Sequence, residues 1–254
     1  MSENTPKDVE ITTCSQCGGE VRLNSKFCNY CGSRLSANSD DFGKSWTRLK
    51  EAALFYGIDI VACCLASFVG IFKTLGWSLF FDILMAISAI LFFAYNWSEN
   101  KHLLKWKSFS FLKLSGYAAI AICCSVIVHY SVGWLNVVIF NKDENYFELL
   151  RGNLAAEVFL IFFTAVMPAL FEELGYRGYL LQNLLRIADK DQAIYITSFL
   201  FAIIHMSFIS LFWLIPFALF LGYTRVKENT LWYGIFIHFF FNLTACVFQI
   251  LAAH

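Results

Sequence analysis

Two adjacent carboxylates, Glu172 and Glu173, stand where acid–base chemistry could take place in apolar surroundings. They open the run Glu172-Glu173-Leu174-Gly175-Tyr176-Arg177, which directly follows the apolar stretch 158–171. On lenient scales, a carboxylate at the centre of a bilayer costs about 2.5–3.5 kcal/mol. Arg177 follows Glu173 by four residues and can pair with it on one helical face, acid before base. Glu172 is left without a local counter-charge, which makes it a functional candidate.

Two further apolar stretches each carry a polar signal. His205 ends the sequence Phe201-Ala202-Ile203-Ile204-His205, and His238 stands four residues before Asn242 in His238-Phe239-Phe240-Phe241-Asn242. The spacing of four places His238 and Asn242 one above the other on a helix. Polar faces of otherwise apolar membrane helices point toward each other or toward a water-filled cavity.

These residue types suit hydrolysis by an activated water molecule. A desolvated carboxylate such as Glu172 can take a proton from water, and a nearby histidine can share that role. A second histidine with an amide donor four residues away can stabilise a tetrahedral oxyanion. The sequence contains no Gly-x-Ser-x-Gly and no His-Glu-x-x-His motif, and a covalent nucleophile is not indicated.

Each motif alone also has a structural explanation: an ion cluster at a helix end, a hydrogen-bonded core histidine, or a polar clamp between helices. In combination and in this order, Glu-Glu-x-x-x-Arg, Phe-x-x-x-His and His-x-x-x-Asn resemble the CAAX-processing and bacteriocin-processing (CPBP or Abi) intramembrane proteases. The resemblance covers roughly residues 110–250. It implies an all-α membrane core whose cavity opens to the cytoplasm, and a membrane-associated peptide or protein as substrate.

The resemblance also implies a role for each motif residue. Glu172 and His205 would activate water, His238 and Asn242 would form the oxyanion hole, and Glu173 and Arg177 would support them. The family was once regarded as metalloproteases, and two glutamates, two histidines and an asparagine could also bind a divalent metal. A second alternative is a non-catalytic membrane scaffold or bacteriocin-immunity protein that binds a peptide in the same cavity.

The composition predicts how these residues are carried. The chain is 58% hydrophobic and 15% charged, against about 45–50% apolar and about 25% charged in average soluble domains. This indicates an all-α polytopic membrane protein. Spans are expected near residues 52–72, 75–97, 114–140, 154–172 and 230–253, with the run 193–223 as a pair of helices turning near Met206 and Ser207. About seven transmembrane helices result.

Basic residues predict the orientation in the cell membrane. Leaving aside Arg177 and the four basic residues of the zinc segment, eleven lie in segments that an inward N-terminus would place in the cytoplasm, and three lie in the opposite loops. The positive-inside rule therefore favours a cytoplasmic N-terminus and an outer C-terminus. Glu172 and His205 then lie at similar depth, about 25 and 22 Å from the charged turn at Asp189-Lys190-Asp191. Residues 177–186 are expected to leave the bilayer, and Pro168 is expected to kink the helix that carries Glu172.

Four cysteines near the N-terminus form a separate signal. Cys14 and Cys17 make one Cys-x-x-Cys pair and Cys28 and Cys31 a second, each followed by a glycine that permits positive φ. Four thiolates are the ligand set of a structural zinc site, whereas a disulfide pair would need an oxidising compartment. We predict a zinc ribbon at 11–36, a linker at 37–51 and a membrane domain at 52–254. A protein partner is expected for the ribbon, and the net charge of zero gives no argument for nucleic acid.

Four titratable residues in or near the spans belong to none of these motifs. They are interpreted as partners between helices or as groups that line a cavity: Asp59, Asp82, His129 and Glu157.

Overall fold

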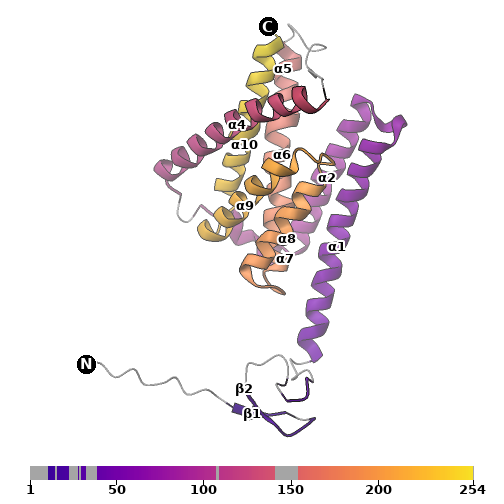
Figure 1. Ribbon diagram of the computed structural model, residues 1–254, viewed down its shortest axis with the longest axis vertical. Helices are drawn as coiled ribbons and strands as arrows, with labels where there is room; N and C mark the ends of the chain where they lie inside the picture. The colour runs from indigo at the N-terminus through magenta and orange to yellow at the C-terminus, as the bar shows by residue number, and fades with distance from the viewer. Residues whose placement is uncertain are drawn as a thin grey trace, which may run out of the picture. The chain divides into compact units, whose positions relative to one another are not determined.

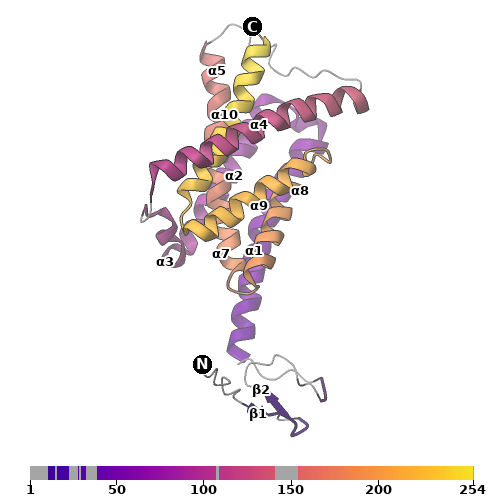
Figure 2. The ribbon, with the colours of Figure 1, turned by 60° about the vertical axis from the view of Figure 1, so that its left-hand side comes forward.

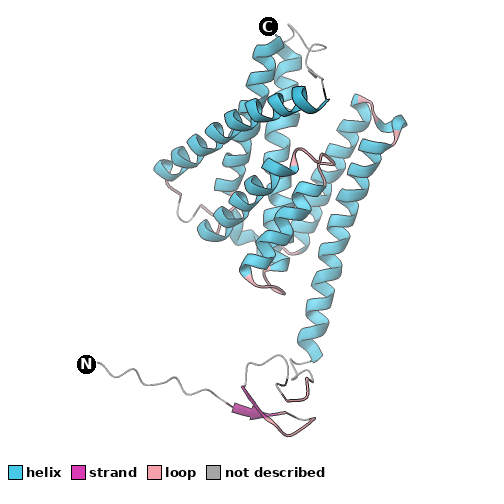
Figure 3. Ribbon diagram, in the orientation of Figure 1, coloured by secondary structure: helices cyan, strands magenta, loops and turns pink. Residues whose placement is uncertain are grey.

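The computed structural model describes residues 11–14, 16–22, 28, 30–32, 39–106, 109–140 and 154–253. The chain divides into two units, Met1–Arg48 and Leu49–His254 (Figure 1). Among the described residues, strands occur only in the first unit, and helices make up the second (Figure 3). Parts of the expected zinc ribbon (23–27 and 33–36) and the expected outer loop with Lys142 and Arg151 lie outside the described residues.

The first unit contains a small antiparallel hairpin. Strand β1 (Ile11–Thr13) pairs with β2 (Glu20–Arg22), with Thr12 opposite Val21. Gly18 and Gly32, the residues after the second cysteine of each pair, have φ of 71° and 72°. The positive φ expected at both glycines is therefore confirmed. Helix α1 (Ser39–Phe68) takes in most of the expected linker.

The second unit is built from long apolar helices, which confirms an all-α membrane protein. Besides α1 it contains α2 (Leu75–Tyr95), α4 (Phe111–Phe140) and α10 (Trp232–Ala253), together with a continuous helix over residues 154–184. Among the described residues, five helices are long and apolar enough to cross a membrane. Large apolar side chains cover their outer faces, and Leu54, Leu91 and Ile127 are 60–65% exposed, as lipid contact requires.

The run 193–223 forms two helices, but they are not a matched pair of full spans. Helix α8 (Lys190–Ile203) has 14 residues, fewer than the roughly 20 that a span needs. Helix α9 (Leu211–Glu228) ends in Arg225, Lys227 and Glu228. The turn between them includes Met206, with φ of 51°, near the expected position. The total of seven spans stays a prediction.

The continuous helix 154–184 is the central element of this unit. It comprises α5 (Leu154–Ile161), the π-helix η4 (Phe162–Val166), α6 (Met167–Glu172), the π-helix η5 (Glu173–Leu180) and α7 (Leu181–Leu184). The wide turn η4 lies directly before Pro168, because proline has no N–H for a regular helical bond. The depth of residues 177–186 in the membrane stays a prediction. Gln182 and Asn183 are buried, with Arg225 donating to Gln182 and Asn96 donating to Asn183.

Aromatic side chains hold the neighbouring helices against η5. Phe55 of α1 packs edge-on against Tyr176 and Tyr179, with ring centroids 5.6 and 5.4 Å apart. Gly175 permits this approach, because a Cβ there would lie 2.7 Å from Phe55 Cζ.

Helix α4 crosses α10 at a slant (Figure 2). Ser125 Oγ donates to the Phe241 carbonyl at 2.8 Å, and His129 stacks on Phe248 at 4.3 Å, so His129 is a partner between helices as interpreted.

Candidate active site

A buried ion cluster forms where η5 packs against α10. Glu173, Arg177 and His238 are 0, 1 and 3% exposed. Glu173 Oε1 lies 3.1 Å from Arg177 Nη1 and 3.2 Å from His238 Nδ1. Arg177 Nη2 donates to the Ala218 carbonyl at 3.4 Å, and its guanidinium lies 4.1 Å above the Phe201 ring centroid. The negative charge of Glu173 is therefore compensated from two directions.

Gly234 makes room for this cluster on α10. A Cβ at Gly234 would lie 2.9 Å from Glu173 Oε2. Gly234 also lies one helical turn before His238 and shares its face. The α10 backbone can therefore approach the Glu173 carboxylate closely enough for His238 to contact it.

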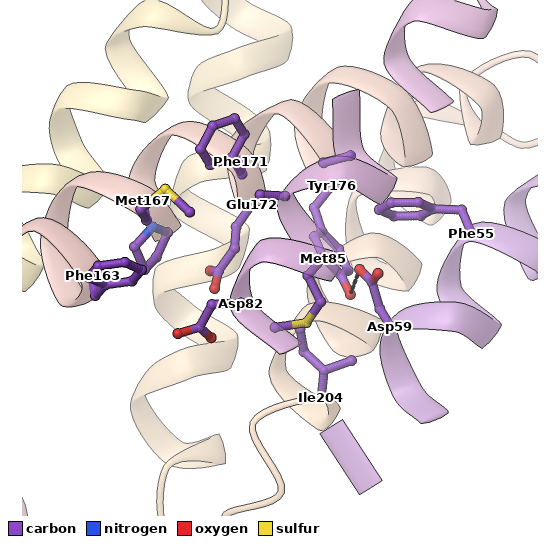
Figure 4. A pocket seen from close by; sticks show the side chains of 13 residues that line it. Phe55, Asp59, Asp82, Met85, Phe163, Met167, Phe171, Glu172, Tyr176 and Ile204 are labelled. Atoms are coloured by element: carbon purple, nitrogen blue, oxygen red, sulfur yellow. Dashed lines mark hydrogen bonds between the residues drawn. The ribbon is translucent and has the colours of Figure 1, made fainter. Parts of the chain in front are cut away.

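Glu172 lies on the open side of the cluster. Its Oε2 atom is 3.8 Å from His238 Nε2, and its side chain is 25% exposed. Oε2 has no hydrogen-bond partner among the described residues. His238 thus lies between the two glutamates, with Nδ1 toward Glu173 and Nε2 toward Glu172. Glu172 also lines a pocket, where its carboxylate points away from its own helix (Figure 4).

His205 joins the cluster through Phe201. Its Nδ1 lies 2.9 Å from the Phe201 carbonyl oxygen, which leaves Nε2 as the ring nitrogen for chemistry. The Phe201 ring meets His205 edge-on at 5.0 Å and His238 at 6.1 Å. One buried aromatic ring therefore contacts both histidines and Arg177. The sequence pattern included Phe201 but assigned it no role, and its spacing of four before His205 was the available signal.

Asn242 makes a contact that the sequence pattern did not predict. Its Nδ2 donates to the Thr164 carbonyl at 3.0 Å. Thr164 is four residues before Pro168, which has no N–H to donate to that oxygen. Asn242 therefore fixes α10 to the π-helical turn. Its amide group has a second N–H that this bond does not use.

The four N-terminal cysteines come together as expected. Their sulfur atoms all lie within 4.8 Å of one another, with Cys14 and Cys31 3.8 Å apart and Cys17 and Cys28 3.5 Å apart. A tetrahedral ion with bonds of about 2.3 Å would separate its sulfur ligands by about 3.8 Å. None of the four forms a disulfide bond. The cluster can therefore hold a metal ion.

The fold and the buried cluster together define a class: a multi-pass α-helical membrane protein with glutamates and histidines gathered between its helices. Residues 154–244, which contain the whole cluster, match the family described as type II CAAX prenyl endopeptidase Rce1-like. This part of the chain is therefore similar to intramembrane proteases of the CAAX type. A search of curated proteins and a search of solved structures found no match.

Proposed function

We propose that the protein is an intramembrane endopeptidase that hydrolyses a peptide bond of a membrane-associated protein or peptide with a water molecule activated by Glu172 and His205. The observation that carries this proposal is the buried Oε2 of Glu172. It has no hydrogen-bond partner among the described residues, and it lies 3.8 Å from His238 Nε2 at the edge of a pocket. A carboxylate oxygen without a hydrogen-bond partner is available to accept a proton from water.

In the proposed reaction, Glu172 takes one proton from water, and the water oxygen bonds to the carbonyl carbon of the substrate. Nε2 of His205 can share that proton. The tetrahedral intermediate collapses, the C–N bond breaks, and the proton passes from Glu172 to the leaving amine. One water molecule is consumed, and a carboxyl group and an amino group are formed.

The oxyanion of the intermediate needs donors, and α10 can supply two. His238 donates from Nε2 when its ring carries a proton there, and the Glu173 carboxylate 3.2 Å from Nδ1 orients the ring. The second N–H of Asn242 is the other donor. Arg177 supports this arrangement by pairing with Glu173. In this proposal the four residues have the roles that the family resemblance implies.

We further propose that the cysteine cluster binds a structural zinc ion, and that the N-terminus is cytoplasmic and the C-terminus outside the cell membrane. A reducing cytoplasm would keep the four thiols free for the metal. A catalytic metal is not required by the proposed steps. Among the described residues, only the four cysteines bring three or more ligand atoms of the kinds that bind metals within 4.8 Å of one another.

Replacing Glu172 tests the proposal directly. Glu172→Gln nearly preserves size but cannot act as a base. We expect cleavage of a membrane-peptide library by the purified full chain to fall by about 10²–10⁴-fold, with peptide binding retained. Glu157→Gln, in the same continuous helix but outside the cluster, is the matched control and should cleave as the wild type does. Cleavage by Glu172→Gln at the wild-type rate would contradict the proposal.

Cleavage assays with a chelator distinguish a protease that activates water with Glu172 from a metal-dependent protease. They are run on the wild type and on Cys14→Ser/Cys17→Ser, which lacks half of the cysteine cluster. Activity that survives chelation in both supports water activated by Glu172. Activity lost on chelation and restored by added metal in the double variant would show that the membrane site itself needs metal. Peptide binding without any cleavage by the wild type would favour the scaffold alternative.

A further inference from the structure

A pocket between α1, α2 and α6 gathers three carboxylates from distant parts of the sequence. Asp59 comes from α1, Asp82 from α2 and Glu172 from α6, and all three line it. The remaining lining is almost entirely apolar and includes Phe55, Met85, Phe163, Met167 and Phe171. Figure 4 shows the Glu172 carboxylate pointing toward the Asp82 side chain, with Asp59 bonded to Tyr176.

Asp59 is the most deeply buried of the three. It is 3% exposed, and its Oδ2 accepts a hydrogen bond from Tyr176 Oη at 3.1 Å. Its other oxygen, Oδ1, is buried and has no hydrogen-bond partner among the described residues, as is also true of Glu172 Oε2. A buried carboxylate oxygen left unsatisfied is costly. Asp59 Oδ1 is therefore an oxygen that a ligand could satisfy, whereas Glu172 Oε2 is left for water.

The charges in the pocket are also unbalanced. No lysine or arginine is among the described residues that line it. Arg177, the nearest buried cation along the chain, pairs with Glu173 on the other side of the helix. Three ionised carboxylates in apolar surroundings repel one another, and a cation that enters the pocket would remove this repulsion.

The geometry favours an organic cation over a metal ion. Ligand oxygens around one metal ion lie within about 5 Å of each other, since each bond is about 2.0–2.6 Å. Among the described residues, the three carboxylates do not form such a group. A guanidinium or ammonium presents several N–H donors over a wider span. The aromatic and methionine walls suit the aliphatic stem of a lysine or arginine side chain and add cation–π attraction.

We propose that this pocket is a subsite for a lysine or arginine side chain of the substrate, next to the bond that Glu172 hydrolyses. Asp59 and Asp82 are then specificity residues that receive the cation, and they take no part in the chemistry. This inference rests on the proposed protease function, which supplies the peptide. It predicts that the protein selects peptides with a basic residue beside the cleaved bond.

Binding of two matched peptides tests the subsite without relying on cleavage. The probes are acetyl-Leu-Leu-Arg-Leu-Leu-amide and the same peptide with citrulline, which has the shape of arginine without its charge. A hydrogen bond to a charged group contributes about 1.5–3 kcal/mol. We therefore expect the detergent-purified full chain to bind the arginine peptide about 10- to 100-fold more tightly. In Asp59→Asn and in Asp82→Asn this ratio should fall to within about threefold of unity.

Asp191→Asn is the matched control. Asp191 also accepts a tyrosine hydroxyl, from Tyr223 at 3.3 Å, but it does not line the pocket. This variant should keep the wild-type ratio. In Asp59→Asn the side-chain amide oxygen can still accept the hydrogen bond from Tyr176 Oη. Thermal unfolding should show that the variants remain folded. A purely structural role of Asp59 would weaken binding of both peptides equally and leave the ratio unchanged, which would overturn the inference.

Two further outcomes would also overturn it. One is equal binding of the arginine and citrulline peptides by the wild type. The other is a bound metal ion, beyond that of the cysteine cluster, which is lost in Asp82→Asn. Cleavage separates this inference from the proposed function. A charge preference in binding with no peptide cleaved supports the subsite and contradicts the protease, whereas cleavage with no charge preference does the reverse.

Discussion

Arg177 makes three different contacts with one planar group. It pairs with Glu173, donates to the Ala218 carbonyl and lies over the Phe201 ring. Lysine could not reproduce this set, because its ammonium is neither planar nor able to stack on an aromatic face. The buried Glu173 charge, which orients His238, therefore depends on this one side chain.

Removing Arg177 should destabilise the fold by leaving Glu173 charged and buried. We expect Arg177→Met to lower the free energy of unfolding by about 3–5 kcal/mol. Glu173→Gln/Arg177→Met removes both charges, so it should recover most of that stability but not the activity. Chemical unfolding in detergent measures the first effect, and peptide cleavage the second. A double variant as unstable as Arg177→Met would contradict the account.

Helix α10 contacts the central helix at regular intervals. Gly234, His238 and Asn242 are spaced by four residues and share one face. Gly234 adjoins Glu173 Oε2, His238 bonds to Glu173, and Asn242 bonds to Thr164. The helix thus contacts both π-helical segments, and Gly234 leaves room for the Glu173 carboxylate.

A methyl group at Gly234 should disturb the site from within the helix. Gly234→Ala would place Cβ 2.9 Å from Glu173 Oε2, and we expect about 1–3 kcal/mol of destabilisation by overpacking together with a loss of cleavage. In Gly116→Ala, the matched control in α4, the added Cβ meets nothing within 4 Å. That variant should be neutral or more stable, as alanine favours helix. Equal behaviour of the two variants in unfolding and cleavage assays would show that close packing at Gly234 is unimportant.

At the scale of the whole molecule, each of the two units is stabilised by a different kind of interaction within itself. The membrane unit packs aromatic and aliphatic side chains around Phe55, Tyr176 and Phe201. The first unit has a core of only Cys14, Val21 and Cys28 among its described residues. So small a core cannot supply the folding free energy, and a metal bound by four thiolates can.

We expect the full chain to bind one zinc ion, and Cys14→Ser/Cys17→Ser to lose it. A hydrogen bond from the Gly19 backbone lowers the pKa of the Cys17 thiol, but hydrogen bonds with the Cys31 and Cys28 thiols raise it. Together these effects raise the pKa of Cys17 to about 12. Without a cation this thiol stays protonated at neutral pH, so zinc must displace its proton, and zinc affinity should rise with pH. Elemental analysis and a competition titration at two pH values measure both effects. Undiminished zinc in the double variant would refute the assignment.

Much of this protein could be predicted from local sequence. Apolar length predicts helices in a membrane, and spacing by four puts Arg177 beside Glu173 and His238 beside Asn242 on single helical faces. The paired cysteines predict a four-sulfur cluster, and its sulfur atoms do come together. These features depend on neighbours within a few residues, where helix or turn geometry alone determines the arrangement.

The tertiary structure decided which faces meet. No sequence spacing indicates that His238 lies between Glu172 and Glu173, that Phe201 contacts both histidines, or that Asn242 donates to Thr164. Asp59 and Asp82 belong to no motif, and only the packing of α1 and α2 against α6 brings them to the Glu172 pocket. The physical reason is that helical periodicity determines the direction of a side chain about its own axis. The partner it meets depends on glycine contacts, proline-induced π turns and aromatic packing between helices that are distant in sequence.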